Sequence, residues 1–567
     1  MVRGLTSLII EKYKWKKVSL SGDLIVDVYS LCHLLHSTKV AISSRCGGDY
    51  VTFSRYVERF LRCLTLNKIN PYFVFDGVDA DQRKKETNNL RRNAAAEVAF
   101  SLLKGKSTNI SKDHLPYLAK LAMIETVRRV LGENNFCVVD GDADGYVANF
   151  AITRNCPVLS LDSDYCIFHI PSGYIPYNKL SWSEDVVEAY IYYYTDFAEQ
   201  FHLQDPSLLI MLPAILGDSK LQTLSDVITR ATGKSWMKLS EAAPHVMDYI
   251  ATFSTLDECK RSISQYDPLI RDNVHSAYQT YIKPPEENRL KYKRRSYVPV
   301  PKFIVDRFRK GKLTQMLMEA ICFSEVDHRI AIEDIQRPWC HMIGLPIRQI
   351  MYGIVSGMYG VTEHHRLKGK IHDFENALVE TNIPVQFWCI SATAAILDPQ
   401  YQTILKGCNE DILLDAIECS KEFKKTVPQE FWFLYHVSRF WYLHAKFDVE
   451  LKNVLLKAII LCVMKNTVAT KWHTSGLPDL PFIFNFSLQS LVHALSQWQS
   501  VYHDLLCLNQ ILLEPLAPMQ ISQTINCTTI IKFHEFITKD AHGDKALISK
   551  MELDEKVYDI LYNLITG

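Results

Sequence analysis

The sequence lacks an excess of charge of either sign, and it lacks a long uninterrupted apolar run. Lysine and arginine together number 63, and aspartate and glutamate together also number 63. A chain-wide positive field that would attract nucleic acid is therefore excluded, and any nucleic-acid partner must be held by local basic patches. The longest apolar stretch, residues 454–464, is interrupted by Lys457 and is well short of the roughly 18 residues that span a bilayer. We expect no membrane partner.

Paired-cysteine motifs are also missing. None of the 15 cysteines belongs to a Cys-x-x-Cys pair, and none is followed by a histidine cluster with zinc-finger spacing. Scattered thiols are typical of reduced intracellular proteins, so we expect neither disulfides nor structural zinc. The first residues show no long apolar segment with a small-residue cleavage site, so we expect no secretory signal. The nucleus and the cytosol remain as locations.

The pattern of short and long segments changes along the chain. Up to about residue 235, short β-branched or aromatic runs alternate with helical patterns, which is typical of an α/β unit with a mostly parallel sheet. Strands are expected at 24–28, 72–75, 136–139 and 157–161, and helices at 53–66, 118–131 and 206–216.

The later part of the sequence follows a helical apolar pattern, as in residues 431–464 and 488–513. A segment rich in basic residues and proline, 283–302, separates the two parts. We therefore predict three regions, which are an α/β domain at 1–235, a helical region with a basic linker at 236–302, and an all-α domain at 303–567.

Carboxylates follow every predicted strand. They are Asp27, then Asp76, then Asp140, Asp142 and Asp144, and finally Asp162 and Asp164. The carboxyl ends of parallel strands meet at one edge of a sheet, so these acids should converge there. We expect the pairs at 142/144 and 162/164 to lie on extended chain, where residues two apart point to the same side. Taken singly, each aspartate is also explained by ordinary turn chemistry after a strand.

Converging carboxylates predict a metal site. They repel one another unless cations neutralise them, and sites made only of oxygen suit Mg²⁺ or Mn²⁺. Two such ions about 4 Å apart can generate hydroxide and stabilise the leaving oxygen of a displacement at phosphorus. The sequence therefore predicts two divalent metal ions and hydrolysis of a phosphodiester.

The segments around these acids also resemble a known superfamily. They read VRGLTSLI at 2–9, LIVDVYSLCHLL at 24–35, GGDY at 47–50, PYFVFDGVD at 71–79, GDADGY at 141–146 and NCPVLSLDSDYCIF at 155–168. Together they resemble the XPG-type flap endonuclease superfamily, which has a PIN-like nuclease fold. Within it, the chain is identified as a member of the asteroid family by GGDY, by residues 155–168, and by three further segments. These are PIRQIMYG at 346–353, QWQS at 497–500 and LNQIL at 508–512.

The resemblance implies roles for the individual acids. One metal would be bound by Asp76, Asp142 and Asp144, the other by Asp162 and Asp164, and Asp27 would act through water. A seventh acid, Asp218, stands one position earlier than the family's Gly-x-Asp pattern, and many relatives carry Glu in place of Asp142 and Asp144. The implied products carry a 5′-phosphate and a 3′-hydroxyl.

Two basic segments are candidates for binding the nucleic acid. Residues 83–92 hold five cations and one acid, where the superfamily places a helical gateway. The resemblance implies that Arg83 and Arg91 contact the scissile phosphate, with Lys84 and Arg92 beside them. Near the start of the chain, lysines alternate with Tyr13 and Trp15, a pattern that can bind phosphates and stack a base. The lysines are Lys12, Lys14, Lys16 and Lys17. Both segments also fit a solvated surface.

The expected substrate follows from what is missing after Asp218. Relatives carry a glycine-rich helix-two-turn-helix that binds duplex DNA. Residues 221–243 of this chain contain a single glycine, Gly233. We therefore predict a structure-specific, metal-dependent DNA endonuclease that acts in nuclear DNA repair on single-stranded, overhang or flap DNA, with protein partners bound through its helical half. The alternative is an inactive scaffold or adaptor in signalling or a repair complex.

Overall fold

The computed structural model describes residues 5, 13–39, 41–78, 82–104, 114–217, 223–233, 239–265, 268–282, 300–356, 360–371, 374–381, 402–468, 488–540 and 542–567. The chain divides into two compact units that are not contiguous in sequence. Unit 1 comprises Met1–Leu31, Glu58–Asn89 and Val130–Leu290, and unit 2 comprises Cys32–Val57, Leu90–Arg129 and Lys291–Gly567. Compact units and sequence domains are different divisions, so the predicted boundaries after residues 235 and 302 stay a prediction.

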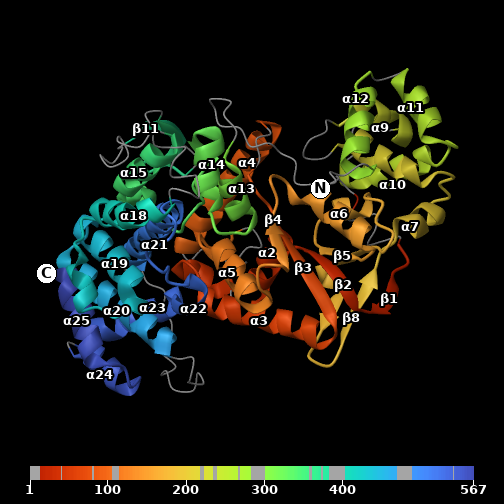
Figure 1. The fold of residues 1–567 in the computed structure, drawn as a ribbon. Helices are drawn as coiled ribbons and strands as arrows, with labels where there is room; N and C mark the ends of the chain where they lie inside the picture. Colours follow the sequence, from red (N-terminus) through yellow and green to blue (C-terminus); the bar gives the residue numbers. More distant parts are fainter. Residues whose placement is uncertain are drawn as a thin grey trace. The chain divides into compact units, whose positions relative to one another are not determined.

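Unit 1 is built on a five-stranded parallel sheet, in the order β4-β3-β2-β5-β6 (Figure 1). The strands are β2 (Gly22–Asp27), β3 (Ile69–Phe75), β4 (Phe136–Val138), β5 (Val158–Ser160) and β6 (Tyr174–Pro176). Leu24, Ile25 and Val26 are almost fully buried, as expected for a strand in the middle of a parallel sheet. The α/β prediction and its four strands are confirmed; β6 was not expected.

Helices complete the core of unit 1. Helix α6 (Ala143–Arg154) packs on β2, β3 and β5 through side chains that include Val147 and Ala151. The predicted helix at 206–216 is found as the 3₁₀ helix η4 (Pro206–Ile210) followed by α8 (Met211–Leu216). All six residues of α8 are buried, because other helices contact it. Those helices are α9 (Ser225–Thr232), α10 (Leu239–Ile250) and α12 (Ile270–Ala277).

A second, smaller sheet in unit 1 was not expected from the sequence. Its strands are β1 (Lys16–Ser19), β8 (Val187–Ile191) and β7 (Leu180–Trp182), paired antiparallel in that order. The short 3₁₀ helix η3 (Tyr177–Lys179) leads from β6 into β7. This sheet therefore continues directly from the end of the parallel one along the chain.

Unit 2 is mainly helical, as expected. Residues 431–464 form α19 (Trp432–His444) and most of α20 (Val449–Val468), and α21 (Leu488–Ile511) covers the second predicted stretch (Figure 1). The expectation that this part is entirely α-helical needs one correction. Strands β9 (Glu325–Val326), β10 (Val361–Arg366) and β11 (Phe374–Val379) form a small sheet. Strand β10 reads VTEHHR, so its polar residues concealed it in the sequence.

The motifs that mark the family in unit 2 are packed in its interior. The Tyr50 hydroxyl donates to the Gln499 side chain at 2.7 Å and to the carbonyl of Gly47 at 2.9 Å. Gly47 and Gly48 have φ angles of +97° and +116°, which favour glycine. GGDY and QWQS therefore hold unit 2 together. No helix in the described part of the chain combines the length and apolarity needed to cross a bilayer.

Candidate metal centre

Three carboxylates meet at the carboxyl edge of the parallel sheet in unit 1. Asp144, Asp162 and Asp164 each offer an oxygen, and these oxygens all lie within 4.8 Å of one another. Asp27 is the last residue of β2, and Asp76 directly follows β3. The structure therefore brings the acids that follow four separate strands to one edge, as their positions in the sequence predict.

The two Asp-x-Asp pairs do not lie on extended chain, so that expectation was wrong. Asp162 is the N-cap of the 3₁₀ helix η2 (Ser163–Cys166), and its carboxylate accepts a hydrogen bond from the backbone N–H of Asp164 at 3.0 Å. Asp142 occupies the N-cap position of α6, and Asp144 lies in its first turn. Each pair thus sits at a helix N-terminus, where backbone N–H groups and the helix dipole favour negative charge.

A glycine lets the loops after β3 and β4 approach each other. The N–H of Gly77 donates to the carbonyl of Gly141 at 2.8 Å, and a Cβ at Gly77 would lie 1.8 Å from the carbonyl oxygen of Val139. Any other residue would push the two loops apart. The neighbouring carboxylate of Asp76 accepts from the N–H of Ala143, the first residue of α6, at 3.0 Å. The glycine thus allows Asp76 to reach the beginning of α6.

Asp27 is held from three directions and is 5% exposed. Its carboxylate accepts from the hydroxyls of Ser160 at 2.5 Å and Ser30 at 2.9 Å, and from the N–H of Tyr29 at 3.2 Å. Burial, and next the charge of Asp76, raise the pKa of Asp27 to about 7, against the opposing effect of the serine hydrogen bonds. Asp27 is therefore rigidly placed but costly to ionise.

The carboxylate of Asp144 is also costly to ionise, and its pKa is raised further than that of Asp27. Burial raises the pKa of Asp144 well above its usual range, and the charges of Asp142, Asp162, Asp27 and Asp164 raise it further. A divalent cation would reverse this effect, because it favours the ionised carboxylates. The donors are all carboxylate oxygens, which suit a hard cation. The residues present therefore fit a divalent metal ion.

Some neighbours of the cluster were not anticipated. The hydroxyl of Tyr165 donates to Asp144 at 3.3 Å, and that of Tyr281 lies 3.5 Å from a carboxylate oxygen of Asp164. Ser160 and Tyr165 belong to the SLDSDY segment and could have been suggested by it. Tyr281 comes from the far end of unit 1, so no local signal in the sequence connects it to the acids.

The structure describes the side chains of only some of the predicted basic residues. Arg92 forms an ion pair with Asp327, and its side chain is largely buried. Lys14 is exposed, and the Lys16 ammonium lies 2.6 Å from the Asp196 carboxylate. Lys12 and Asp218 lie outside the described residues. The side chains of three others, all on α4 (Gln82–Leu103), also lie outside them; these are Arg83, Lys84 and Arg91. The DNA-binding and metal-binding roles of all these residues stay predictions.

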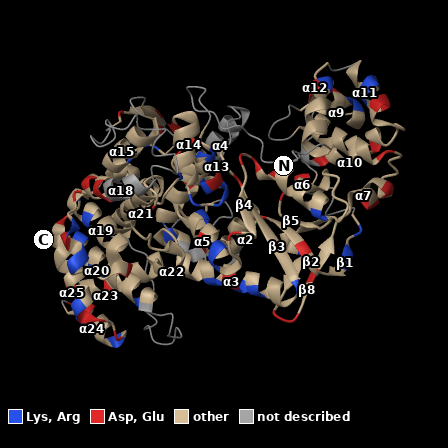
Figure 2. Ribbon diagram, viewed as in Figure 1, with Lys and Arg blue, Asp and Glu red and all other residues tan. Residues whose placement is uncertain are grey.

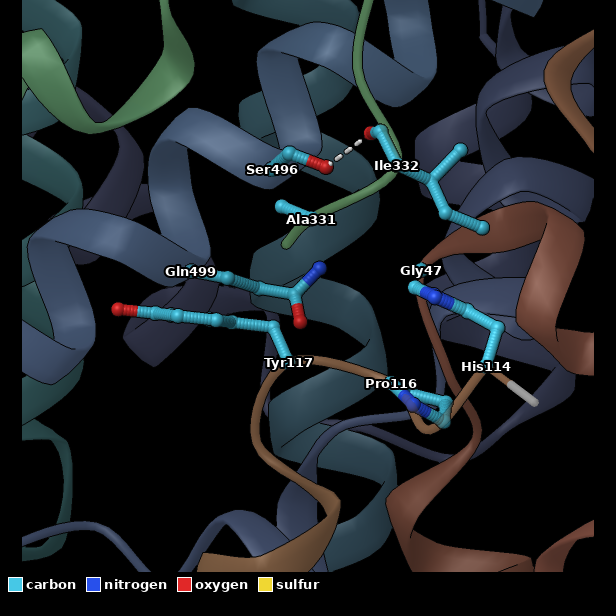
Figure 3. Close-up of a pocket in the computed structure, with 8 residues that line it drawn as sticks. All are labelled: Gly47, His114, Pro116, Tyr117, Ala331, Ile332, Ser496 and Gln499. Carbon is cyan, nitrogen blue, oxygen red and sulfur yellow. Dashed lines mark hydrogen bonds between the residues drawn. The ribbon is translucent and has the colours of Figure 1, made fainter. Parts of the chain in front are cut away.

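A small cavity lies in unit 2, between the GGDY and QWQS segments (Figure 3). It is lined by Gly47, His114, Pro116, Tyr117, Ala331, Ile332, Ser496 and Gln499. No carboxylate lines it, and burial lowers the pKa of His114 to about 4, so this histidine is neutral at pH 7. The cavity therefore lacks the ligands of a hard cation, whereas the acidic edge of unit 1 has them.

Comparisons with known proteins relate this chain to two family models. The family model described as "XPG domain containing" matches residues 116–301, and the Asteroid N-terminal domain model matches residues 485–565. The single-strand DNA endonuclease ASTE1 of Mus musculus is 23% identical over 620 residues, which cover 99% of this chain and 90% of the relative. This chain belongs to the asteroid family. The family predicted from the sequence motifs is thus confirmed.

Other members and solved structures are also similar. Protein asteroid of Drosophila melanogaster is 32% identical over 178 residues, which cover 31% of this chain and 20% of that protein. The catalytic core of Rad2 with DNA substrate has a TM-score of 0.30 at 16% identity, covering 51% of this chain and 87% of that one. Human GEN1 with Holliday junction DNA has a TM-score of 0.33 at 14% identity, covering 51% and 68%. The asteroid-family assignment rests on the sequence matches.

Proposed function

We propose that this asteroid-family protein is an endonuclease, a phosphodiester hydrolase of the XPG type that cuts single-stranded, overhang or flap DNA. The observation that carries the proposal is the convergence of Asp144, Asp162 and Asp164 within 4.8 Å, with buried Asp27 beside them. Such mutual repulsion has no use in a site that binds no cation. The name of the ASTE1 relatives, single-strand DNA endonuclease, supports this substrate class.

The metal dependence is proposed as two Mg²⁺ or Mn²⁺ ions. The residues that would hold them are Asp27, Asp76, Asp142, Asp144, Asp162 and Asp164, with Asp218 as a seventh. When bound, such ions supply a hydroxide nucleophile and stabilise the charge on the leaving oxygen. We further propose 5′-phosphate and 3′-hydroxyl products, phosphate contacts from Arg83 and Arg91, and a nuclear role in DNA repair.

The protein's own residues prepare this site. Ser30 and Ser160 fix both the position and the orientation of the Asp27 carboxylate, and the N–H of Ala143 does the same for Asp76. Tyr165 donates to Asp144, which restricts its rotation. Carboxylates fixed in advance need little reorganisation when a cation and a phosphate arrive, and this lowers the barrier to reaction.

The alternative function, a scaffold, is favoured by one observation. The family-specific motifs GGDY, PIRQIMYG and QWQS lie in unit 2, where they contribute to packing and to none of the acidic site. A protein used only as an adaptor would keep these motifs and have no need of the cation. Partners bound through the helical half stay a prediction under either function.

Cleavage assays decide between the two. Labelled single-stranded, 5′-flap, 3′-overhang and blunt duplex DNA would be incubated with the protein in Mg²⁺, Mn²⁺ or EDTA, and product lengths read on a sequencing gel. We expect metal-dependent cutting that Asp76→Ala plus Asp162→Ala reduces by about 10²- to 10⁴-fold, because metal catalysis is worth several kcal/mol.

The matched control is Asp226→Ala plus Asp306→Ala, which removes two acids outside the site and should cut normally. Equal inactivity of wild type and the double variant on every substrate would contradict the endonuclease and favour the scaffold.

A further inference from the structure

The small antiparallel sheet of unit 1 presents an exposed tyrosine on its outer face. Along β8, Val187, Ala189 and Ile191 are at most 3% exposed, whereas Tyr190 is 43% exposed. The register places Lys17 of β1 directly opposite Tyr190, so the two side chains share this outer face. One face of the sheet is thus packed against unit 1, and the other offers an aromatic ring beside a lysine.

A second lysine lies between two aromatic rings on this sheet. The ammonium of Lys179, the last residue of η3, is 5.1 Å from the ring centre of Trp15 and 5.8 Å from that of Tyr190. Both distances are typical of cation–π contacts. Among the described carboxylates, none forms an ion pair with Lys179. We call Trp15, Lys17, Lys179 and Tyr190 the aromatic–lysine face.

The indole of Trp15 packs against a neighbouring ring, but its N–H group lacks a hydrogen-bond partner among the described residues. The indole lies edge-on against Tyr13, with ring centres 5.2 Å apart. The Nε1 atom is itself buried, so the half-buried Trp15 offers a ligand a rigid ring surface and no accessible donor.

The charge on the face is positive and available. Lys17 pairs with Glu188 at 2.8 Å, but the two side chains are 54% and 35% exposed, so water weakens the pair and a phosphate can replace the carboxylate. Lys16, the neighbouring residue on the strand, points to the opposite side and pairs with Asp196 at 2.6 Å, so it adds no free charge to this face; β1 appears blue in Figure 2. Among the described residues, Glu188 pairs with Lys17, and no carboxylate pairs with Lys179.

The face is joined to the acidic site by one short helix. The hydroxyl of Tyr177, the first residue of η3, donates to the backbone carbonyl of Asp27 at 2.9 Å. Lys179 is the last residue of the same helix. The position of the aromatic–lysine face is therefore fixed relative to the end of β2, within one unit.

We propose that the aromatic–lysine face binds single-stranded DNA, with bases stacked on Tyr190 and Trp15 and phosphates contacted by Lys17 and Lys179. Rings combined with free cations bind single strands with little dependence on sequence, because every base has a π face. The strand would be the part of the substrate outside the scissile phosphate, so this inference rests on the proposed function. A protein partner would instead have to supply acids that neutralise both lysines.

Binding can be measured without cleavage. The full-length protein would be titrated into a fluorescein-labelled oligothymidylate in EDTA, with fluorescence anisotropy as the readout. We expect Tyr190→Ala to weaken binding about 5- to 100-fold, as for loss of a stacked base. Tyr190→Phe, which keeps the ring, should bind nearly as wild type does.

Lys179→Gln tests the phosphate contact. It should weaken binding and reduce the slope of log Kd against log salt concentration by about 0.7, the value for one phosphate contact on a single strand. Two matched controls remove exposed groups elsewhere and should bind normally. These are Leu443→Ala, for an exposed apolar side chain, and Lys550→Gln, for an exposed lysine. Melting temperatures would verify that every variant folds.

The proposal is overturned if wild type does not bind the oligonucleotide, or if Tyr190→Ala and Lys179→Gln bind as wild type does. Equal loss of affinity for blunt duplex would also overturn it, because duplex bases are not free to stack on the rings. Failure of the endonuclease proposal looks different. In that case no DNA is cut in either metal, while the loss of oligonucleotide binding by Tyr190→Ala persists.

Discussion

In unit 2, Glu363 is buried beside Arg348, whereas in unit 1 the half-buried Asp144 lies beside other carboxylates. Arg348 is fully buried and donates to Glu363 at 2.6 and 2.9 Å and to Asp504 at 2.8 Å. Burial alone would raise the pKa of Glu363, yet the guanidinium holds it well below the usual range. For Asp144, burial and its neighbours act in the same direction and raise the pKa.

The two sites differ in whether a cationic side chain neutralises the acid. Glu363 finds its counter-charge within the chain, and the resulting network links β10, α15 (Leu345–Ser356) and α21. The pKa of Asp504 is nevertheless raised to about 7 by its burial, so one arginine does not fully compensate two acids. In the acidic edge of unit 1, the largest charge effects on Asp144 among the described residues come from other carboxylates, and a bound divalent cation would supply a counter-charge.

The largest expected effect comes from removing the internal counter-charge. Arg348→Met leaves Glu363 and Asp504 buried without a cation and should lower the free energy of unfolding by about 3–5 kcal/mol. Urea denaturation followed by circular dichroism would measure it. Arg307→Met, which breaks the more exposed pair with Glu514, is the matched control and should cost at most about 1 kcal/mol. Equal costs would contradict the distinction between the two kinds of acid.

The next effect is a pH dependence of the parallel sheet in unit 1. The folded pKa of Asp27, about 7, lies above its unfolded value of roughly 3.9. Stability in EDTA is therefore fully present below the unfolded value and is lost as the pH rises through about 7, by up to roughly 4 kcal/mol. Hydrogen exchange of peptides covering β2 and β5 at pH 6 and pH 8 would show it. Asp27→Asn should abolish the difference; if the difference persists, another group is responsible.

Metal should reverse the instability of the acidic edge. At an ion concentration about 100 times Kd, Mg²⁺ or Mn²⁺ should stabilise the protein by about 2.7 kcal/mol. Thermal unfolding with added metal or with EDTA measures the gain. Asp144→Asn plus Asp162→Asn should remove the gain and be more stable than wild type in EDTA, since the repulsion is gone. A gain retained by this variant would place the metal elsewhere.

The smallest effect tests the hydrogen bonds that the acidic edge does have. Ser160→Ala removes one donor to Asp27 and should cost about 1.5 kcal/mol at pH 8, because Ser30 and the N–H of Tyr29 remain. It should also move the pH at which stability is lost to a higher value. Ser172→Ala, which removes an exposed hydroxyl bonded to Asn155, should change neither property. Urea denaturation across pH 6 to 8 gives both quantities.

Sequence reasoning succeeded where the physical signal is local. Buried strands read as apolar runs that end in aspartate, so β2, β3, β4 and β5 could be placed, and with them the edge where the acids meet. Sequence reasoning failed where a strand depends on residues that are far apart in the chain. The charged strand β10 is buried only because distant residues neutralise it, and β1 pairs with β8, which lies about 170 residues further along the chain.

By itself, the sequence determined the parallel sheet, the family, and the set of acids that follow the strands. Hydrophobic runs and strand-end residues depend on their immediate neighbours, so they can be read directly. Only the tertiary structure decided that Asp142/Asp144 and Asp162/Asp164 sit on helix N-termini, that Ser160 holds Asp27, and that Lys179 lies between two rings. These features depend on which distant segments pack together, and packing is settled by the whole fold and not by any one stretch of the chain.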